Sequence, residues 1–394
     1  MRPYYTDPYT VEFDATVRQS LKWNGATAVL LDNSYFSPTS GGQEHDTGKI
    51  GNSTVVDVVE DDENVLHIVS EDPDSSTVHC KIDWDRRFRN MQQHTGQHIL
   101  SAAFENLLDI QTVSSRLGES IGTIDLSRAP TEKELSEAVA AATKVVEENR
   151  PVNIHFADKS DISRFRLRKP PKVEGTVRIV EVKDFDFSPC GGTHCTHTSE
   201  VGVILTGTIE KVKGALTRIE FTCGRRATDY YYGLLNSSIE ISRLVSAPVA
   251  DIPSAVIKLS EQLHEKEKQL KVLLRKLADA VYHKIVPVVD QTSEKLPVIN
   301  MDDDVTDAEE LRFVASTASR ELKKSFLFYR TEGENCQMVV NLVVDEKKAA
   351  DIVDHLRKSF GVKGGGRNGF YSLILNSFEL PGVIENIKGA LSND

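Results

Sequence analysis

The feature that most constrains this fold is a pair of short motifs that lie far apart in the chain. The segment His94–His98 reads HTGQH, and the segment Cys190–His194 reads CGGTH about 90 residues later. Thiolate and imidazole are both good ligands for zinc. If one metal binds the four side chains, the fold must bring the two motifs together. The predicted metal ligands are His94, His98, Cys190 and His194.

Each motif suits a different local structure. Apolar residues recur at helical spacing around the first motif, which predicts a helix that begins near Asp85. His94 and His98 then lie one turn apart on one face of that helix, as two imidazoles need in order to reach one metal. The two glycines of the second motif allow a tight turn. No glutamate stands between the two histidines, so a metalloprotease is disfavoured.

The number of candidate ligands leaves the role of the metal open. Four protein ligands close a tetrahedral shell, which is typical of structural zinc, whereas catalytic zinc keeps one position for water. Either one ligand leaves during catalysis, or the metal anchors the fold or the substrate. Cys195 and His197 lie just beyond the motif, and we expect the next strand to carry both away from the metal.

Length and composition indicate a multidomain globular protein. The 394 residues predict roughly two to four domains, and the net charge is −12. No run approaches the roughly 18 apolar residues of a membrane span, and the N-terminus lacks a secretory signal pattern. Five cysteines at irregular spacing do not form a disulfide framework. We expect a cytoplasmic protein without membrane contact, whose acidic total still permits a local basic groove.

Residues 1–85 predict a small β-barrel or sandwich. Short β-branched runs alternate with Gly and Asn turns, and residues 60–63 (EDDE) predict a hairpin tip. The segment Ser40–Gln43 (SGGQ) has two interpretations. It is either an ordinary turn in which Gly41 and Gly42 have positive φ, or a backbone loop that approaches a ligand closely.

Residues 86–245 predict an α+β domain. After the motif helix, Thr131 and Glu134 form a capping box that begins a second helix running to Asn149. A short helix is expected near 161–167. The predicted strands are Val152–Phe156, Thr176–Val182, Val201–Ile209 and Leu216–Thr222.

Residues 246–290 predict a long helix that pairs as a coiled coil. Apolar residues fall near a heptad pattern of about four heptads, which Lys266 interrupts and Pro287 ends. The seam residues are Val256, Leu259, Leu263, Leu270, Leu273, Leu277 and Val281. Residues 291–394 predict an α/β domain in the order strand, helix, strand, strand, helix, strand, with helices at Asp307–Lys324 and Glu346–Phe360. Its segment Gly364–Arg367 (GGGR) is either a flexible turn or a backbone nest for phosphate.

Basic residues cluster in spite of the acidic total. They are either solvated faces with salt bridges or a phosphate track beside the metal. The three groups are Arg86, Arg87 and Arg89; Arg164, Arg166, Arg168, Lys169 and Lys172; and Arg225 and Arg226.

Together these residues resemble the editing half of alanyl-tRNA synthetase and its free-standing relatives, the AlaX-type alanyl-tRNA editing proteins. The likeness rests on the two ligand motifs, the SGGQ loop and the opening Tyr5–Tyr9, and it runs through Gly224–Ala227. The tail with GGGR resembles the DHHA1 domain that closes the synthetase. We expect no aminoacylation core before residue 1, and the chain then resembles the long free-standing form.

The resemblance implies an α+β multidomain protein and an ATP-independent hydrolase. The implied parts are a barrel at 1–85, a zinc-binding editing domain at 86–245, a long helix at 246–290 and a DHHA1-like domain at 291–394. The implied reaction is hydrolysis of Ser-tRNA(Ala), and often Gly-tRNA(Ala), with Zn²⁺ held by the four predicted ligands. The expected editing-pocket residues are Thr39, Gly41, Gly42 and Gln43. The expected tRNA contacts are Arg225, Arg226, Lys363, Gly364, Gly365, Gly366 and Arg367.

The chemistry agrees with this task but leaves alternatives. An aminoacyl ester is already activated, so positioning and charge stabilisation matter more than a strong nucleophile. A pocket that satisfies a serine hydroxyl rejects alanine, and we expect Gln43 and nearby loop groups to do this. The alternatives are a non-catalytic tRNA-binding protein with structural zinc, and an editing enzyme for a threonyl or prolyl species. We also expect a homodimer through the long helix or the C-terminal domain.

Overall fold

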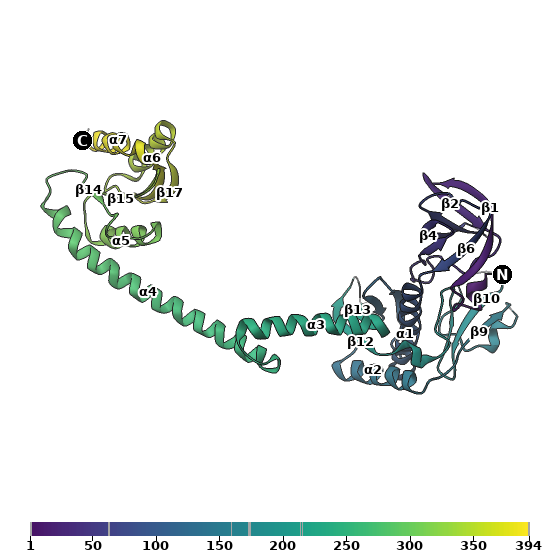
Figure 1. Cartoon of the computed structure of the whole chain (residues 1–394). Helices are drawn as coiled ribbons and strands as arrows, with labels where there is room; N and C mark the ends of the chain where they lie inside the picture. The colour runs from purple at the N-terminus through teal and green to yellow at the C-terminus, as the bar shows by residue number, and fades with distance from the viewer. Residues whose placement is uncertain are drawn as a thin grey trace. The chain divides into compact units, whose positions relative to one another are not determined.

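In the computed structural model, the first strands of the chain close into a barrel, as the sequence predicts (Figure 1). The model describes residues 2–61, 64–158, 160–171, 175–212, 214 and 216–392. It divides into two compact units, Met1–Ile241 and Ser242–Asp394. A short 3₁₀ helix, Pro3–Tyr5, precedes the barrel. The six barrel strands are β1 (Glu12–Trp23), β2 (Ala26–Leu31), β3 (Gly48–Ile50), β4 (Ser53–Asp61), β5 (Asn64–Val69) and β6 (Thr77–Ile82).

Turn chemistry sets the barrel register. Asn24 and Gly25 both have positive φ and join β1 to β2, as a tight hairpin turn requires. The predicted acidic hairpin joins β4 to β5, where Asp61 pairs with Asn64, and residues 62–63 lie outside the described residues.

A buried ion pair fastens the barrel to the first long helix, α1 (Trp84–Leu108). The side chains of Arg87 on α1 and Asp46 in a barrel loop are both fully buried and paired. The Arg87 guanidinium also donates to the carbonyl oxygens of Pro8 at 2.7 Å and Tyr35 at 2.6 Å. A buried charge needs such a complete set of partners. Arg87, a member of the first basic group, therefore has a structural role and is not available to bind phosphate.

Helix α1 is the centre of the first unit. Asp83 caps its first turn by accepting from the Arg86 amide, and Asp109 ends it with a positive φ of 53°. Nearly every residue from Asn90 to Phe104 is buried, because the helix has neighbours on all sides.

Two sheets and a second helix surround α1. The sheet β12-β13-β8-β7 and the sheet β11-β10-β9 are both antiparallel, and their inner residues share one core with α1 and α2. The predicted capping box of Thr131 and Glu134 is confirmed at the start of α2. The elements are β7 (Thr112–Arg116), β8 (Gly122–Leu126), α2 (Glu132–Glu147), β9 (Val152–Ala157), β10 (Val177–Val182), β11 (Asp186–Pro189), β12 (Ile204–Lys211), β13 (Thr217–Cys223) and α3 (Gly224–Val245), with 3₁₀ turns at Ile162–Arg164 and Thr198–Val201.

The sequence prediction missed four of these elements: β7, β8, β11 and the 22-residue helix α3. The three strands are only four or five residues long and mix polar with apolar side chains, so their pattern is weak. The predicted short helix at 161–167 is only a 3₁₀ turn.

The second unit holds the long helix α4 (Ile252–Gln291), preceded by a 3₁₀ turn at Val249–Asp251, and a five-stranded sheet. The prediction that Pro287 ends the helix is wrong, since α4 continues to Gln291. Ala278, Val281, Ile285 and Val289 are buried in the core that α4 shares with α5, and this packing holds the helix together through the proline. Val281 is therefore a core residue of its own unit and not an exposed seam residue.

The C-terminal sheet has the order β14-β15-β16-β18-β17, and β14 pairs with β15 in parallel. The predicted helix Glu346–Phe360 is confirmed, and the other predicted helix runs from Ala308 to Glu321. The prediction missed β17 and the last helix. The elements are β14 (Val298–Asn300), α5 (Ala308–Glu321), β15 (Phe326–Glu332), β16 (Asn335–Asn341), α6 (Glu346–Phe360), β17 (Lys363–Arg367), β18 (Phe370–Asn376), a 3₁₀ turn (Ser377–Glu379) and α7 (Leu380–Ser392).

The GGGR segment is an edge strand, so the prediction of a flexible turn is wrong, whereas phosphate binding at this segment stays a prediction. A Cβ on Gly364 would lie 2.3 Å from the Ser372 carbonyl oxygen, and one on Gly366 would lie 2.0 Å from that of Phe370. The glycines thus allow close approach of the β17 and β18 backbones. No helix among the described residues is long and apolar enough to cross a membrane.

Candidate metal centre

The structure brings the four predicted ligands together. Their donor atoms lie within 4.8 Å of one another. Helix α1 carries His94 and His98, and the turn after β11 carries Cys190 and His194. The Cys190 sulfur lies 3.2 Å from His94 Nε2 and 3.4 Å from His194 Nε2. The three histidines are buried, and Cys190 is the only ligand of the four that is partly exposed.

Each histidine meets a different partner on the ring nitrogen that points away from the cluster. Nδ1 of His94 lies 2.9 Å from Gln43 Oε1. Nδ1 of His98 lies 3.4 Å from Asp186 Oδ2. Nδ1 of His194 lies 3.2 Å from Thr95 Oγ1. Partners of this kind fix the orientation of metal-binding imidazoles. The arrangement leaves all three Nε2 atoms for one metal, so the residues fit zinc.

The contact between Asp186 and His98 connects the cluster to a buried cation. Asp186 accepts from Arg168 Nε at 2.9 Å and from Ser188 Oγ at 2.9 Å. No hydrogen bond is described for His98 Nδ1, although the Asp186 carboxylate lies 3.4 Å from it. A metal on Nε2 would place a proton on Nδ1, facing this carboxylate.

The electrostatics of the cluster favour a thiolate at Cys190 and neutral imidazoles at His94 and His194. Burial tends to raise the pKa of the Cys190 thiol, but His94 and His194 together lower it well below its usual range. Burial lowers the pKa of His94 and of His194. Burial also acts to lower the pKa of His98, but its contact with Asp186 leaves that pKa raised. Zinc requires deprotonated ligands, so Cys190 is suited to bind it.

The SGGQ segment is a tight turn that lies against the ligands. Ser40 and Gln43 exchange backbone hydrogen bonds of 3.0 Å and 2.9 Å, and Gly41 and Gly42 have φ values of 61° and 83°. The turn interpretation is therefore confirmed. A Cβ on Gly41 would lie 3.3 Å from the His94 ring and 3.5 Å from the Cys190 sulfur. The turn also lies close to the side chains of the predicted metal ligands, and its approach to a bound ligand stays a prediction.

Gln43 links the barrel to the CGGTH turn. Its Nε2 donates to Thr193 Oγ1 at 2.8 Å, and its Oε1 accepts from the Thr193 amide at 3.1 Å as well as contacting His94. The side chain is buried, so its contact with a substrate hydroxyl stays a prediction. Thr39 is exposed, and its hydroxyl lies 3.5 Å from His45 Nδ1.

Arg178 is a functional candidate that the sequence did not reveal. It is buried on β10, and its Nη1 donates to the carbonyl oxygens of Cys190 at 2.6 Å and Gly192 at 2.9 Å. Its guanidinium lies 5.0 Å from the centre of the Tyr5 ring. Arg178 holds the CGGTH backbone, and no local motif signals this role.

Cys195 and His197 lie outside the four-residue cluster. Cys195 is buried, its amide donates to Thr95 Oγ1 at 3.0 Å, and burial raises the pKa of its thiol. His197 is exposed. Among the described residues, the metal cluster has the four predicted members.

Several predicted cations are engaged in protein contacts. Arg86 pairs with Glu44 and Glu119, and Arg225 pairs with Asp85. Arg226 is buried and donates to Asn90 Oδ1 at 2.7 Å. The remaining predicted cations include Arg89, which pairs with Asp85 and Asp229; Arg164, which pairs with Asp161; and Lys172, which lies outside the described residues.

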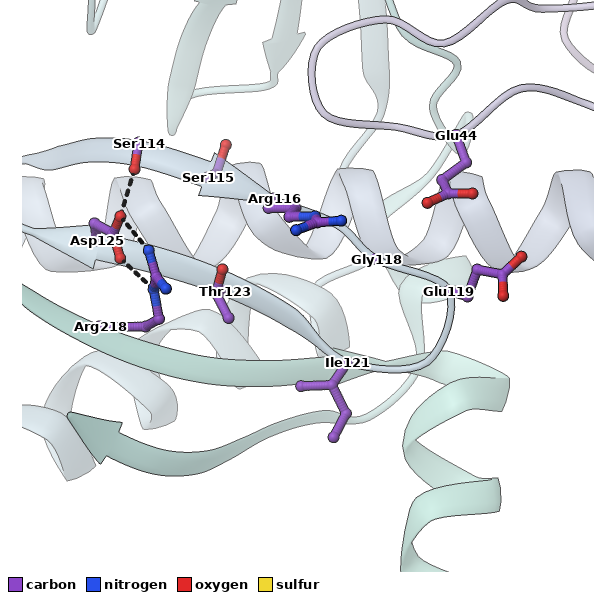
Figure 2. Close-up of a pocket in the computed structure, with 10 residues that line it drawn as sticks. All are labelled: Glu44, Ser114, Ser115, Arg116, Gly118, Glu119, Ile121, Thr123, Asp125 and Arg218. Carbon is purple, nitrogen blue, oxygen red and sulfur yellow. Dashed lines mark hydrogen bonds and ion pairs between the residues drawn. The ribbon is translucent and has the colours of Figure 1, made fainter. Parts of the chain in front are cut away.

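A polar pocket of about 550 Å³ lies beside the SGGQ turn (Figure 2). Strands β7, β8 and β13 and the loop at 117–121 form it, with Glu44 at one end. Its lining residues are Glu44, Ser114, Ser115, Arg116, Gly118, Glu119, Ile121, Thr123, Asp125 and Arg218.

Comparisons with known proteins give the family of the chain. A family model described as the threonyl and alanyl tRNA synthetase second additional domain matches residues 177–220, which include Cys190 and His194. The alanyl-tRNA editing protein AlaX-L of Pyrococcus horikoshii is 34% identical over 283 residues, which are 68% of this chain and 70% of that protein. The alanine–tRNA ligase of Sulfurisphaera tokodaii is 27% identical over 412 residues, 99% of this chain and 44% of the ligase.

Two further matches cover very different shares of the chain. The alanine–tRNA ligase of Archaeoglobus fulgidus is 28% identical over 379 residues, 92% of this chain and 41% of the ligase. The chain thus spans less than half of both ligases. The crystal structure of the C-Ala domain from Aquifex aeolicus alanyl-tRNA synthetase is 19% identical, with a TM-score of 0.21, and covers 25% of this chain and 93% of that domain. A likeness this weak carries no argument about the fold of this chain.

Proposed function

Because this chain belongs to the family of AlaX-L alanyl-tRNA editing proteins, we propose that it is a hydrolase that edits mischarged tRNA(Ala). The proposed substrate is Ser-tRNA(Ala), with Gly-tRNA(Ala) as a second substrate. The proposed reaction is hydrolysis of the 3′-terminal ester, which needs no ATP. The observation that carries the proposal is the SGGQ turn lying against the ligands, since Gly41 approaches both His94 and Cys190.

Zinc is the proposed metal, held by His94, His98, Cys190 and His194. When bound, zinc supplies positive charge that polarises or orients an ester group. The residues of the chain do the positioning. Gln43, Thr95 and Asp186 hold the three imidazoles, and Arg178 holds the CGGTH turn. The partly exposed Cys190 marks the side from which a substrate reaches the cluster.

We propose that the SGGQ turn forms the wall of the editing pocket that selects the amino acid. Thr39, Gly41 and Gly42 are exposed at this wall, whereas Gln43 supports it from within. A hydroxyl group such as that of Thr39 can pair with the serine hydroxyl, and with alanine it would be left unpaired. Loss of such a pair supports strong discrimination.

The second candidate function is a tRNA-binding protein with structural zinc. The observation in its favour is the complete set of four protein ligands with buried supporting contacts. A third candidate, editing of a threonyl or prolyl species, uses the same chemistry and is tested with the same assay.

A deacylation assay distinguishes the candidates. Purified protein is incubated with tRNA charged with serine, glycine, alanine, threonine or proline, and release of the amino acid is measured. The assay compares the wild type with His98→Ala. The control variant is His79→Ala, which changes an exposed histidine of the barrel. Editing predicts rapid release of serine, slower release of alanine, and loss of activity in His98→Ala alone. Binding of tRNA without release of any amino acid would favour the second candidate. Release of threonine or proline in place of serine would favour the third.

The remaining predicted tRNA contacts belong to the proposal. They are Arg225 and Arg226 in the first unit, and Lys363, Gly364, Gly365, Gly366 and Arg367 in the second. All five residues of the second group are exposed on the edge strand β17, where a backbone and two cations can meet phosphate. We assign the C-terminal α/β region the DHHA1-like role of binding tRNA.

A further inference from the structure

Arg226 is a buried cation that has no carboxylate partner among the described residues. It lies in the first turn of α3, it is 7% exposed, and its Nη2 donates to Asn90 Oδ1 at 2.7 Å. Its Nε and Nη1 atoms are also buried, and no described residue accepts a hydrogen bond from either atom. A buried charge without partners is strongly unfavourable, so this guanidinium group requires a counter-ion.

Two other arginines of the first unit are buried to the same extent, and both have the partners that Arg226 lacks. Arg87 pairs with Asp46 and donates to two carbonyl oxygens. Arg178 donates to the carbonyl oxygens of Tyr5, Cys190 and Gly192. Burial of an arginine in this fold therefore does not by itself leave its donors unpaired.

Two further arginines, Arg86 and Arg89, lie close enough to act on the charge of Arg226. Burial lowers the pKa of Arg226, the charges of Arg86 and Arg89 lower it further, and Glu44 opposes them more weakly. Both neighbouring arginines are already paired in a partly exposed network. Their carboxylate partners are Glu44, Glu119, Asp85 and Asp229. Water and salt screen such exposed pairs, so the pairs do not compensate for the buried charge.

We propose that Arg226 is the centre of a binding site for one anionic group of the phosphate class. Phosphate oxygens can accept from Nε and Nη1, and a guanidinium group suits such oxygens well. The partial positive charge at the start of α3 favours an anion at the same place. A single unpaired cation matches a phosphodiester or a free phosphate ion better than a polyphosphate. The phosphate belongs either to an RNA backbone, which rests on the proposed function, or to the free ion.

Asn90 connects this site to the SGGQ turn. Its Oδ1 accepts from Arg226, and its Nδ2 donates at 3.3 Å to the carbonyl oxygen of Glu44, the residue after Gln43. Asn90 also lies on α1, one turn before His94. A phosphate that fixes Arg226 therefore also fixes Asn90, and its binding stabilises the first unit.

Thermal unfolding in inorganic phosphate tests the site. Tryptophan fluorescence reports the first unit, which holds both Trp23 and Trp84, and chloride keeps the ionic strength constant. A ligand that binds only the folded state raises Tm with the logarithm of its concentration once that concentration exceeds Kd. We expect this rise for the wild type when phosphate replaces chloride. A wild type without any rise overturns the proposal.

Variants of Arg226 separate specific binding from the general stabilising effect of phosphate salts. Arg226→Met removes the charge and should show the general effect alone, whereas the control Arg18→Met, an exposed arginine on β1, should respond as the wild type does. Arg226→Lys keeps the charge but lacks the planar guanidinium group, and it should bind phosphate about tenfold more weakly. Arg226→Lys decides the test if Arg226→Met does not fold. A full wild-type response in the folded Arg226 variants means an adventitious ion only and overturns the site.

Unacylated tRNA distinguishes the two sources of phosphate. If RNA supplies it, tRNA abolishes the effect of free phosphate, and Arg226→Met lowers the salt dependence of tRNA binding by about one phosphate contact. If the free ion is the ligand, the wild type and Arg226→Met bind tRNA alike. Both results support the site.

Release of serine from Ser-tRNA(Ala), measured in parallel, separates the site from the proposed function. A wild type that binds phosphate through Arg226 but releases no serine keeps the site and loses the editing function. A wild type that releases serine but does not respond to phosphate keeps the editing function and loses the site.

Discussion

The Asp186 carboxylate lies 3.4 Å from Nδ1 of His98, and both side chains are buried beside the metal cluster. We predict that Asp186→Asn lowers zinc affinity by about 10- to 100-fold, because a metal-binding imidazole loses its charged partner. Competition with a chromophoric chelator measures this affinity, and the cobalt-substituted spectrum reports the ligand geometry. The control is Asp184→Asn, an exposed aspartate in the preceding turn. Equal zinc affinity in the two variants would show that Asp186 does not position His98.

Gln43 supports both His94 and Thr193 from a buried position. We predict that Gln43→Ala reduces deacylation of Ser-tRNA(Ala) and of Gly-tRNA(Ala) by a similar factor, about 10-fold or more, because the imidazole orientation is lost for both substrates. Parallel assays of kcat and KM with the two substrates check this. A loss confined to the serine substrate would instead mean that Gln43 contacts the serine hydroxyl. Unchanged rates on both substrates would remove Gln43 from the site.

His67 predicts a pH-dependent loss of barrel stability. It is fully buried, its Nδ1 lies 3.0 Å from the Val29 carbonyl oxygen, and burial lowers its pKa from 6.5 to about 4. Since the unfolded chain binds the proton more readily, the neutral form stabilises the fold above pH 6.5. This stability, on the order of 3 kcal/mol, is lost as the pH falls from 6.5 to 4.

Denaturant unfolding followed by tryptophan fluorescence checks the prediction for His67. Both tryptophans, Trp23 and Trp84, lie in the first unit, so the signal reports that unit alone. The wild type should lose more free energy of unfolding between pH 7 and pH 5 than His67→Gln does. Parallel curves for the two proteins would contradict the prediction.

The exposed apolar face of α4 predicts a homodimer. Leu263 and Leu273 are 63% and 62% exposed, which is unfavourable for a face that stays in water. A second copy of the helix would cover this face, as the heptad pattern indicates. We predict a dimeric mass for the wild type by light scattering and a monomeric mass for the double variant Leu263→Glu, Leu273→Glu. The control Lys268→Glu, on the same helix, should stay dimeric. A monomeric wild type at working concentration would rule out this interface.

Local sequence patterns predicted the elements whose signals are short-range. The Thr131 capping box and the helix Glu346–Phe360 depend on contacts within a few residues, and both were read directly from the chain. Pro287 and the glycines of β17 show the opposite case. Packing against α5 carries α4 past a proline, and pairing with β18 makes a strand of a glycine run. Neither neighbour is visible in a local pattern.

The residues of the candidate site also fall into those that the sequence predicted and those that only the structure revealed. The sequence alone predicted the four residues of the cluster, because the chemistry of zinc restricts ligand types and each pair lies within one turn or loop. Only the tertiary structure decided what surrounds them. Gln43, Thr95, Arg178 and Asp186 come from a barrel loop, a helix and two strands, and they meet the motifs through hydrogen bonds or close polar contacts. Such contacts depend on distance in space and leave no periodic signal along the chain.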